Sequence, residues 1–330
     1  MNPIAISVGG VVLYWSSLLL CLGAAAWLTL ALALYRTDGG PAGAVWVWFP
    51  FAVLFSVLLA RFLHWYCHAE QYTGLLAAMT RYDGGGYCLP GLLLGTALAA
   101  LLAVRLGFAP GAAGLLDALA PGAALCITLI RLGALFGSAD RGKLLITKPV
   151  LQHLPFAAPV ATASGAVEYR FATFFVEFLL LLALSLWLLR FYLRQRHAPM
   201  RGGRADGSVA LLFLVLLSAV ELVADSTRYD SSFLRSNGFV SLTQIVSAAA
   251  ILAVLIYYVV RSVKARGFAP QHILLVLLWL AGLGATAYLE YLVQRHGDWY
   301  LFCYAMMSLS CAAMALAPCL AYRTLRVRSR

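Results

Sequence analysis

Charged side chains are scarce in this chain of 330 residues. Asp, Glu, Lys and Arg together make up 11% of the positions and apolar residues 63%, and the mean hydropathy is +0.87. A soluble globular domain carries about 25% charged residues. So few charges could not cover the surface of a water-soluble protein of this size, and the composition therefore predicts an integral membrane protein.

Several common sequence features are also missing. The chain has no CxxC pair, P-loop or dinucleotide fingerprint, and no cofactor is expected. No internal repeat is evident, which disfavours transporter folds built from duplicated halves, although charges within apolar runs keep a transporter as a third possibility. The first ten residues carry no charged side chain. Because the basic n-region of a signal peptide is absent, we expect the first apolar run to be retained as a helix.

What the sequence does contain is a series of long apolar runs, each close to the roughly 20 residues that cross a bilayer as a helix. Only helices and closed barrels satisfy the backbone within lipid, and barrel strands would alternate apolar and polar residues. We therefore predict an all-α, polytopic transmembrane helix bundle with nine crossings. The runs are residues 10–34, 43–63, 88–104, 118–136, 171–190, 208–224, 240–260, 272–292 and 298–321.

The net charge of +11 does not indicate a nucleic-acid partner, because the basic residues follow the membrane topology. Of the 24 Lys and Arg residues, 14 cluster after alternate runs, on one side of a nine-helix arrangement. The positive-inside rule makes that side cytoplasmic. We therefore expect a multi-pass protein of the cell membrane with its N-terminus outside and its C-terminus in the cytoplasm.

Ionisable side chains inside or at the rim of membrane spans are costly, so each is a candidate for function. Arg131 lies near the outer end of its apolar run. It would either hold phosphate oxygens with its planar guanidinium, or reach the interface or a carboxylate as a structural residue. Glu221, Asp225 and Arg228 are spaced to share one helical face. They would form an ion-paired interior site near Arg131, or simply the frayed outer end of a helix.

A further polar cluster follows the second run. Arg61, His64 and His68 share a helical face, and neighbouring aromatic residues favour a position at the membrane interface. His64 and His68, together with Cys67 and Glu70, could be imagined as metal ligands. A histidine pair without a clear third ligand is weak support for a metal, and no metal site is predicted.

Six segments occur in an order typical of one family. The chain resembles prolipoprotein diacylglyceryl transferase over about residues 10–260. The segments are VLYWSSLLL, LARFLHWY, YDGGGYCLPGLLLG, RLGALFGSADRG, YRFATFFVEFLL and SAVELVADSTRYD, the last followed by SLTQIVS. The resemblance implies a seven-helix transferase-like membrane domain at 1–264 and a two-helix C-terminal extension at 265–330.

The resemblance also assigns individual residues. Arg61, Arg131, Gly142, Glu177 and Arg228 fall on residues of the family motifs. The implied catalytic residues are Arg131, Glu221 and Asp225, and the implied substrate-binding residues are Arg61, His64, Asp140, Gly142, Glu177 and Arg228.

The sequence departs from the family pattern at several of its motif positions. Asp225 replaces a glutamate, and Asp140 is adjacent to the position of the signature glutamate, which is Ala139. The family histidine is Leu89, and an arginine of the late helix is Glu221. These changes remove one cation and one candidate base from the expected site.

The family activity moves diacylglycerol from phosphatidylglycerol to a cysteine thiol. The resemblance therefore implies a divergent bacterial transferase of lipoprotein biosynthesis, acting at the outer leaflet on a phosphatidylglycerol-like phospholipid, with a lipoprotein precursor peptide or another molecule as acceptor. The alternative is a catalytically inactive membrane scaffold of the same fold that binds lipid or a partner.

Overall fold

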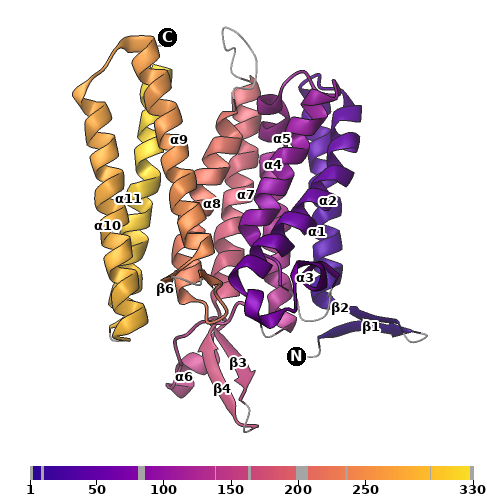
Figure 1. Ribbon diagram of the computed structural model, residues 1–330, viewed down its shortest axis with the longest axis vertical. Coiled ribbons are helices and arrows are strands. Elements are labelled where there is room, and N and C mark those ends of the chain that lie inside the picture. The colour runs from indigo at the N-terminus through magenta and orange to yellow at the C-terminus, as the bar shows by residue number, and fades with distance from the viewer. Residues whose placement is uncertain are drawn as a thin grey trace. The chain divides into compact units, whose positions relative to one another are not determined.

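The structure is a computed structural model, and it describes residues 3–8, 11–80, 86–137, 139–162, 165–197, 207–234, 237–297 and 299–327. The described residues contain eight helices that are long and apolar enough to cross a membrane, and one shorter apolar helix at Leu89–Arg105. The sheets are three separate two-stranded hairpins. The predicted class, an all-α polytopic helix bundle, is confirmed (Figure 1).

Each of the nine predicted runs overlaps one of these helices. They are α1 (Trp15–Thr37), α2 (Ala42–Cys67), α4 (Leu89–Arg105), α5 (Ala112–Gly133), α7 (Thr173–His197), α8 (Ser208–Thr227), α9 (Leu242–Arg266), α10 (Pro270–Arg295) and α11 (Tyr300–Val327). The shortest, α4, has 17 residues. At 1.5 Å per residue it is about 26 Å long, slightly less than the hydrocarbon core of a typical bilayer.

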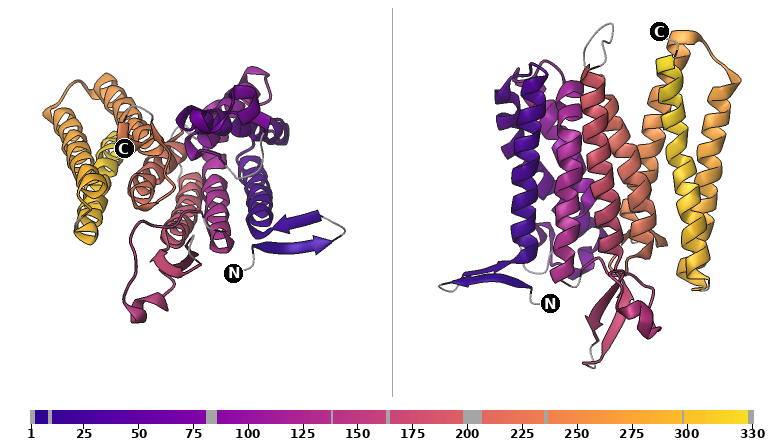
Figure 2. Two further views of the ribbon diagram at one scale, coloured as in Figure 1. Left: turned by 60° about the horizontal axis from the view of Figure 1, so that its bottom comes forward. Right: turned by 180° about the vertical axis from the view of Figure 1, so that it is seen from behind.

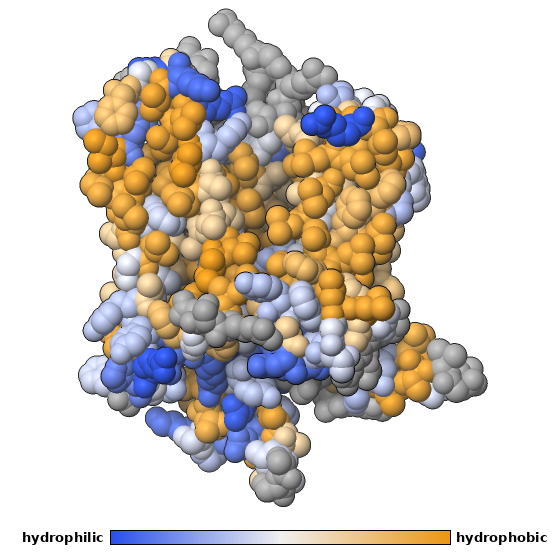
Figure 3. Space-filling model, viewed as in Figure 1, coloured by the Kyte–Doolittle hydropathy of each residue, from blue (hydrophilic) through white to orange (hydrophobic). Residues whose placement is uncertain are grey.

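The chain divides into two compact units. Unit 1 comprises Met1–Trp65, Tyr72–Phe213 and Thr227–Asp230, and unit 2 comprises Tyr66–Gln71, Leu214–Ser226 and Ser231–Arg330. In both units, apolar residues cover the middle of the helices and hydrophilic residues gather near the helix ends (Figure 3). This pattern is the one that a lipid environment requires of membrane-spanning helices. The division at residues 264 and 265 stays a prediction.

Helix α5 lies at the centre of unit 1. In its most apolar window 67% of the residues are buried, compared with 17% in α1 and 22% in α2. Both α1 and α7 pack along α5. The indole Nε1 of Trp27 on α1 donates to the carbonyl of Leu119 at 2.9 Å, and the hydroxyl of Ser185 on α7 donates to the carbonyl of Pro121 at 3.0 Å. Charged groups on α5 are therefore largely enclosed by protein.

Small residues bring α2 and α4 into close contact. A Cβ at Gly91 or Gly95 would overlap the α2 backbone at Ala60 or Ser56. The Ser56 hydroxyl donates to the carbonyl of Leu92 at 2.9 Å. Small residues one helical turn apart are a common means of joining helices in membranes, where the hydrophobic effect does not drive association.

One end of unit 1 carries its short elements (Figure 2). Strands β1 (Ile4–Val8) and β2 (Val11–Tyr14) form an antiparallel hairpin that leads into α1. The predicted long outer segment, 137–170, contains helix α6 (Pro149–Gln152) and the antiparallel hairpin of β3 (Ala157–Ala161) and β4 (Val167–Phe171). Helix α3 (Leu75–Thr80) and the 3-10 turn η2 (Ala134–Phe136) complete the short helical elements of unit 1, and the 3-10 turn η1 (Ala69–Gln71) belongs to unit 2.

In unit 2, α10 and α11 pack together and both contact α9. Strands β5 (Phe233–Leu234) and β6 (Asn237–Ser241) lead into α9, whose start is fixed by a capping box. The Gln244 backbone N–H donates to the Ser241 hydroxyl at 3.1 Å, and the Gln244 side chain accepts from the Ser241 N–H at 2.9 Å. The hydroxyls of Thr286 and Ser310 lie 2.7 Å apart and join α10 to α11.

Candidate functional site

The site begins with Arg131, in the last turn of α5. Its residue exposure is only 8%, because α5 is the central helix of unit 1. A buried guanidinium is strongly destabilising unless it is paired. In the structure Arg131 is paired with carboxylates, and its contact with phosphate stays a prediction.

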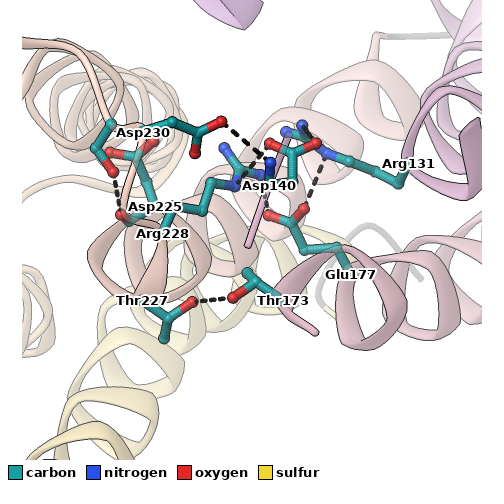
Figure 4. Close-up of polar contacts among 9 residues, drawn as sticks. Arg131, Asp140, Thr173, Glu177, Asp225, Thr227, Arg228 and Asp230 are labelled. Carbon is teal, nitrogen blue, oxygen red and sulfur yellow. Dashed lines mark hydrogen bonds and ion pairs between the residues drawn. The ribbon is translucent and has the colours of Figure 1, made fainter. Parts of the chain in front are cut away.

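Two acidic residues from different elements form ion pairs with the Arg131 guanidinium (Figure 4). Its Nε lies 3.0 Å from Oε2 of Glu177, on the first turns of α7, and its Nη1 lies 3.0 Å from Oδ2 of Asp140, in the loop after η2. The Glu177 side chain is 1% exposed and the Asp140 side chain 16%. These two carboxylates fix the end of α5 to α7 and to the loop.

Arg228 closes the arrangement from the other side. Its Nε lies 3.3 Å from Oδ1 of Asp140, and its Nη2 contacts Oε1 of Glu177. Each carboxylate therefore bridges both arginines, and each arginine contacts both carboxylates. We call Arg131, Asp140, Glu177 and Arg228 the ion-pair ring. All four belong to unit 1, and their formal charges cancel.

Asp140 reaches both arginines because of an unusual backbone conformation. Its φ is +56°, in the left-handed region that L-residues rarely adopt and that Asp tolerates better than most. Its backbone N–H donates to Oδ2 of Asp230 at 3.0 Å. The local contact thus stabilises the conformation that directs the Asp140 carboxylate into the ring.

Main-chain hydrogen bonds fasten the loop around Asp140. The N–H of Gly142 donates to the carbonyl of Phe171 at 2.7 Å, and the N–H of Lys143 donates to the carbonyl of Thr227 at 2.8 Å. A Cβ at Gly142 would lie 2.8 Å from the backbone oxygen of Phe171. The end of β4 can therefore come this close to position 142 only because that residue is a glycine. The predicted site residue Gly142 therefore has a positional role in the loop.

The ring changes the acidity of Asp140. Burial acts to raise the pKa of this carboxyl, but the positive charges of Arg131 and Arg228 outweigh burial, and the net pKa lies below its ordinary value. A carboxylate stabilised in this way binds a proton weakly at neutral pH. Asp140 is therefore suited to hold the arginines and poorly suited to act as a general base.

Two predicted site residues, Arg61 and His64, hold a neighbouring segment of unit 1. The Nε of Arg61 donates to the carbonyl of Ala78 at 2.6 Å, and its Nη1 donates to the carbonyl of Gly86 at 3.1 Å. The Arg61 guanidinium also lies 5.4 Å from the centre of the Tyr72 ring, which makes an edge contact with His64. These contacts join α2 to the segment that follows it.

Glu221 and Asp225 lie in the part of α8 that belongs to unit 2. Both are buried, with residue exposures of 1% and 3%. The Asp225 carbonyl accepts a hydrogen bond from the Ser231 hydroxyl. Their burial matches the expectation of interior positions for this face of α8, and their catalytic roles remain predictions.

The structure adds polar residues that the sequence reasoning missed. The hydroxyls of Thr173 and Thr227 lie 2.8 Å apart and join the start of α7 to the end of α8 beside the ring (Figure 4). Asp117 is fully buried near the start of α5, where its carboxylate accepts from the N–H groups of Gly207 and Ala210. Asp117 therefore caps the start of α8 from another helix. In the sequence, the signal for this role is a single acidic residue next to an apolar run.

The described residues contain no group of three or more His, Cys, Asp or Glu side chains that could hold a metal ion. In particular, the side chains named as conceivable metal ligands, among them Cys67, do not form such a group. Cys67 is buried as a free thiol.

Comparison with known families relates this geometry to a reaction class. The family model for prolipoprotein diacylglyceryl transferase matches residues 3–260. No curated protein matches the sequence significantly. The matched region includes all four residues of the ion-pair ring and ends within α9, so α10 and α11 lie outside it.

Proposed function

This chain belongs to the prolipoprotein diacylglyceryl transferase family, and from that premise we propose that it is a membrane transferase with a phospholipid donor. The donor is a phosphatidylglycerol-like lipid in the outer leaflet, and the acceptor is the cysteine thiol of a lipoprotein precursor or another nucleophile. The observation that carries the proposal is the buried ion-pair ring, which holds two arginines of the family motifs at the end of α5 and α8.

The reaction requires a fixed arrangement of charge. The thiolate sulfur attacks the terminal glycerol carbon of the diacylglyceryl group, forming a sulfur–carbon bond, while the bond from that carbon to the phosphate oxygen breaks. Glycerol phosphate leaves with the electron pair, and the thiol proton passes to a base. Positive groups that are already in place stabilise the charge that develops on the leaving phosphate, without reorganising during the reaction.

The ring supports this proposal through its rigidity. Arg131 is fixed by Glu177 and Asp140 at 3.0 Å each, and Arg228 is held by the same two carboxylates. A guanidinium has five N–H donors, so contacts with carboxylates and with a phosphate are compatible in one side chain. The ring would orient the arginines, and the phosphate would approach from the lipid.

One observation favours a second candidate, a catalytically inactive lipid-binding or partner-binding scaffold. The formal charges of the ring cancel, and Leu89 and Glu221 stand where the family pattern has a histidine and an arginine. A site that has lost a cation and a base, and whose two arginines are neutralised, can keep the fold without the reaction.

Lipid labelling of a lipoprotein precursor separates the two candidates. The chain is expressed in bacterial cells depleted of their own transferase, with R131A as the test variant and R170A as the control. Arg170 is a matched control because it pairs with Glu168 at 3.2 Å on the partly exposed strand β4. For a transferase we expect labelling by wild type and R170A, and a loss of about 100-fold or more in R131A, as for other electrostatic stabilisers.

The scaffold candidate predicts a different result. Wild-type protein would be present in the membrane and no precursor would be labelled, which would rule out the transferase proposal for that acceptor. The proposed orientation, N-terminus outside and C-terminus cytoplasmic, is tested separately by the protease accessibility of a tag at each terminus in intact cells. Cleavage of the C-terminal tag from outside would contradict it.

A further inference from the structure

Arg141, next to the ring, is a buried cation whose hydrogen-bonding capacity is largely unused. Its residue exposure is 5%, and its guanidinium lies 4.5 Å from the centre of the Phe174 ring. Its Nη2 donates to the carbonyl of Gly137 at 2.7 Å. Its Nε and Nη1 are buried and have no hydrogen-bond partner among the described residues.

The carboxylates near Arg141 are already engaged. Asp140, its neighbour in the chain, contacts both Arg131 and Arg228. Asp230 accepts the Asp140 backbone N–H and is exposed to solvent, so that water screens its charge. Because the ion-pair ring is neutral, Arg141 leaves the buried part of this loop with one net positive charge.

An arrangement of this kind is unfavourable without a ligand. A buried donor without a partner loses its hydration and gains nothing in return, and a buried cation lacks compensation as well. An anion with several oxygen atoms would remove both deficits, because each oxygen accepts charge-assisted hydrogen bonds. Phosphate suits a guanidinium in both charge and geometry. The Phe174 ring covers one side of the guanidinium at 4.5 Å.

We propose that Arg141 is an anion-binding residue of this site, and that its ligand is a phosphate monoester or diester such as the glycerophosphate part of a phospholipid. The ion-pair ring then positions the loop, and Arg141 supplies the charge that the ring does not. The inference rests on the proposed function for the choice of ligand. The observation of an unsatisfied buried guanidinium stands independently of the transfer reaction.

Binding measurements on the full-length protein test the proposal. The protein is placed in nanodiscs of phosphatidylcholine, and the affinity for glycerol 1-phosphate and for inorganic phosphate is measured by calorimetry. A second set of nanodiscs containing phosphatidylglycerol is analysed by native mass spectrometry for retained lipid. The three probes distinguish a lipid head group from a free phosphate as the source of the bound oxygens.

The test variant is R141M, which keeps an apolar stem over Phe174 and removes the charge and the N–H donors. R141K keeps the charge without the planar group, and R170M is the matched control on the neighbouring hairpin. We expect R141M to weaken the binding of the preferred phosphate probe by about 10- to 100-fold, as expected for lost charge-assisted hydrogen bonds. R141K should lie in between, and R170M should bind like wild type. Thermal unfolding of each variant confirms that the fold is kept.

Two results would overturn the inference. One is wild-type affinity in a folded R141M protein, and the other is the absence of any phosphate binding by wild type. The labelling experiment distinguishes this failure from that of the proposed function. If wild type labels the precursor and R141M binds phosphate normally, only the inference fails. If wild type binds phosphate through Arg141 but labels no precursor, the inference stands and the transferase proposal fails for that acceptor.

Discussion

Removing Glu177 tests whether the ion-pair ring holds unit 1 together. Its carboxylate is 1% exposed and bridges Arg131 and Arg228. In E177A both guanidiniums stay buried, and each loses one of its two carboxylate partners in the ring. Breaking a buried ion pair by removing one partner costs about 3–5 kcal/mol. We expect a loss of this size in the free energy of unfolding, measured by denaturant titration of the protein in detergent micelles.

A double-mutant cycle separates the ion pair from general damage to the core. E177A, R228M and the double variant are compared with wild type, since methionine keeps most of the buried stem of Arg228. If the pair is real, the double variant loses less stability than the sum of the single variants, with a coupling of about 1–3 kcal/mol. The reasoning is refuted if the single effects add within about 0.5 kcal/mol.

The Glu168–Arg170 pair provides the control cycle. Its side chains are 40% and 26% exposed, and their closest atoms lie 3.2 Å apart. Exposed pairs contribute about 0–1 kcal/mol because water screens them and both side chains lose conformational freedom. A coupling in the control as large as that in the ring would show that separation alone, and not burial, sets the strength of these pairs.

Three further predictions concern the surroundings of the ring. G142A should lower the free energy of unfolding by about 1–3 kcal/mol, because the added methyl group meets the Phe171 carbonyl. If the 137–170 segment of this variant resists limited proteolysis as well as the wild-type segment does, the prediction is wrong. The pKa of Asp140 is lowered in the folded protein. The stability difference between wild type and D140N should therefore be constant at neutral pH and should shrink only below about pH 4, as the wild-type carboxyl becomes protonated. A shrinking of this difference already between about pH 6 and 8 would exclude the lowered pKa. D117A removes the acceptor of two N–H groups at the start of α8 and should cost about 1–2 kcal/mol, whereas an unchanged unfolding midpoint would show that the cap has no energetic role.

Much of the fold could be predicted because the lipid environment imposes one simple rule. Long apolar runs must form helices that satisfy their own backbone, and the nine runs each overlap an observed helix. The hairpin β3–β4 was not predicted, because its residues combine apolar, polar and proline positions without a regular alternation. Register in such a hairpin depends on contacts with the helices beside it, which a local pattern does not contain.

The site could be predicted in its components and less well in its pairing. Arg131 and Glu177 were selected from their motif positions, and the structure places them 3.0 Å apart. The sequence had suggested a carboxylate face on α8 as the partner of Arg131. The structure shows Asp140 and Glu177 in contact with Arg131, and the role of the α8 face stays a prediction. The role of Asp140 depends on a left-handed backbone and on the N–H contact with Asp230, and neither follows from residue type alone.

The same pairing limits which group could take the thiol proton in a transfer reaction. A general base works best when its pKa is near the operating pH, but two guanidiniums hold the pKa of Asp140 low despite its burial. Glu177 bridges the same two arginines, so protonating it would discard two buried ion pairs. In the proposed reaction we therefore expect the ring carboxylates to act as counter-ions and the base to lie outside the ring. Of the residues predicted from sequence, His64, Glu221 and Asp225 remain for that role. The choice between a transferase and a scaffold therefore depends less on the arginines, which the ring fixes in either case, than on whether one of these three groups reaches the acceptor.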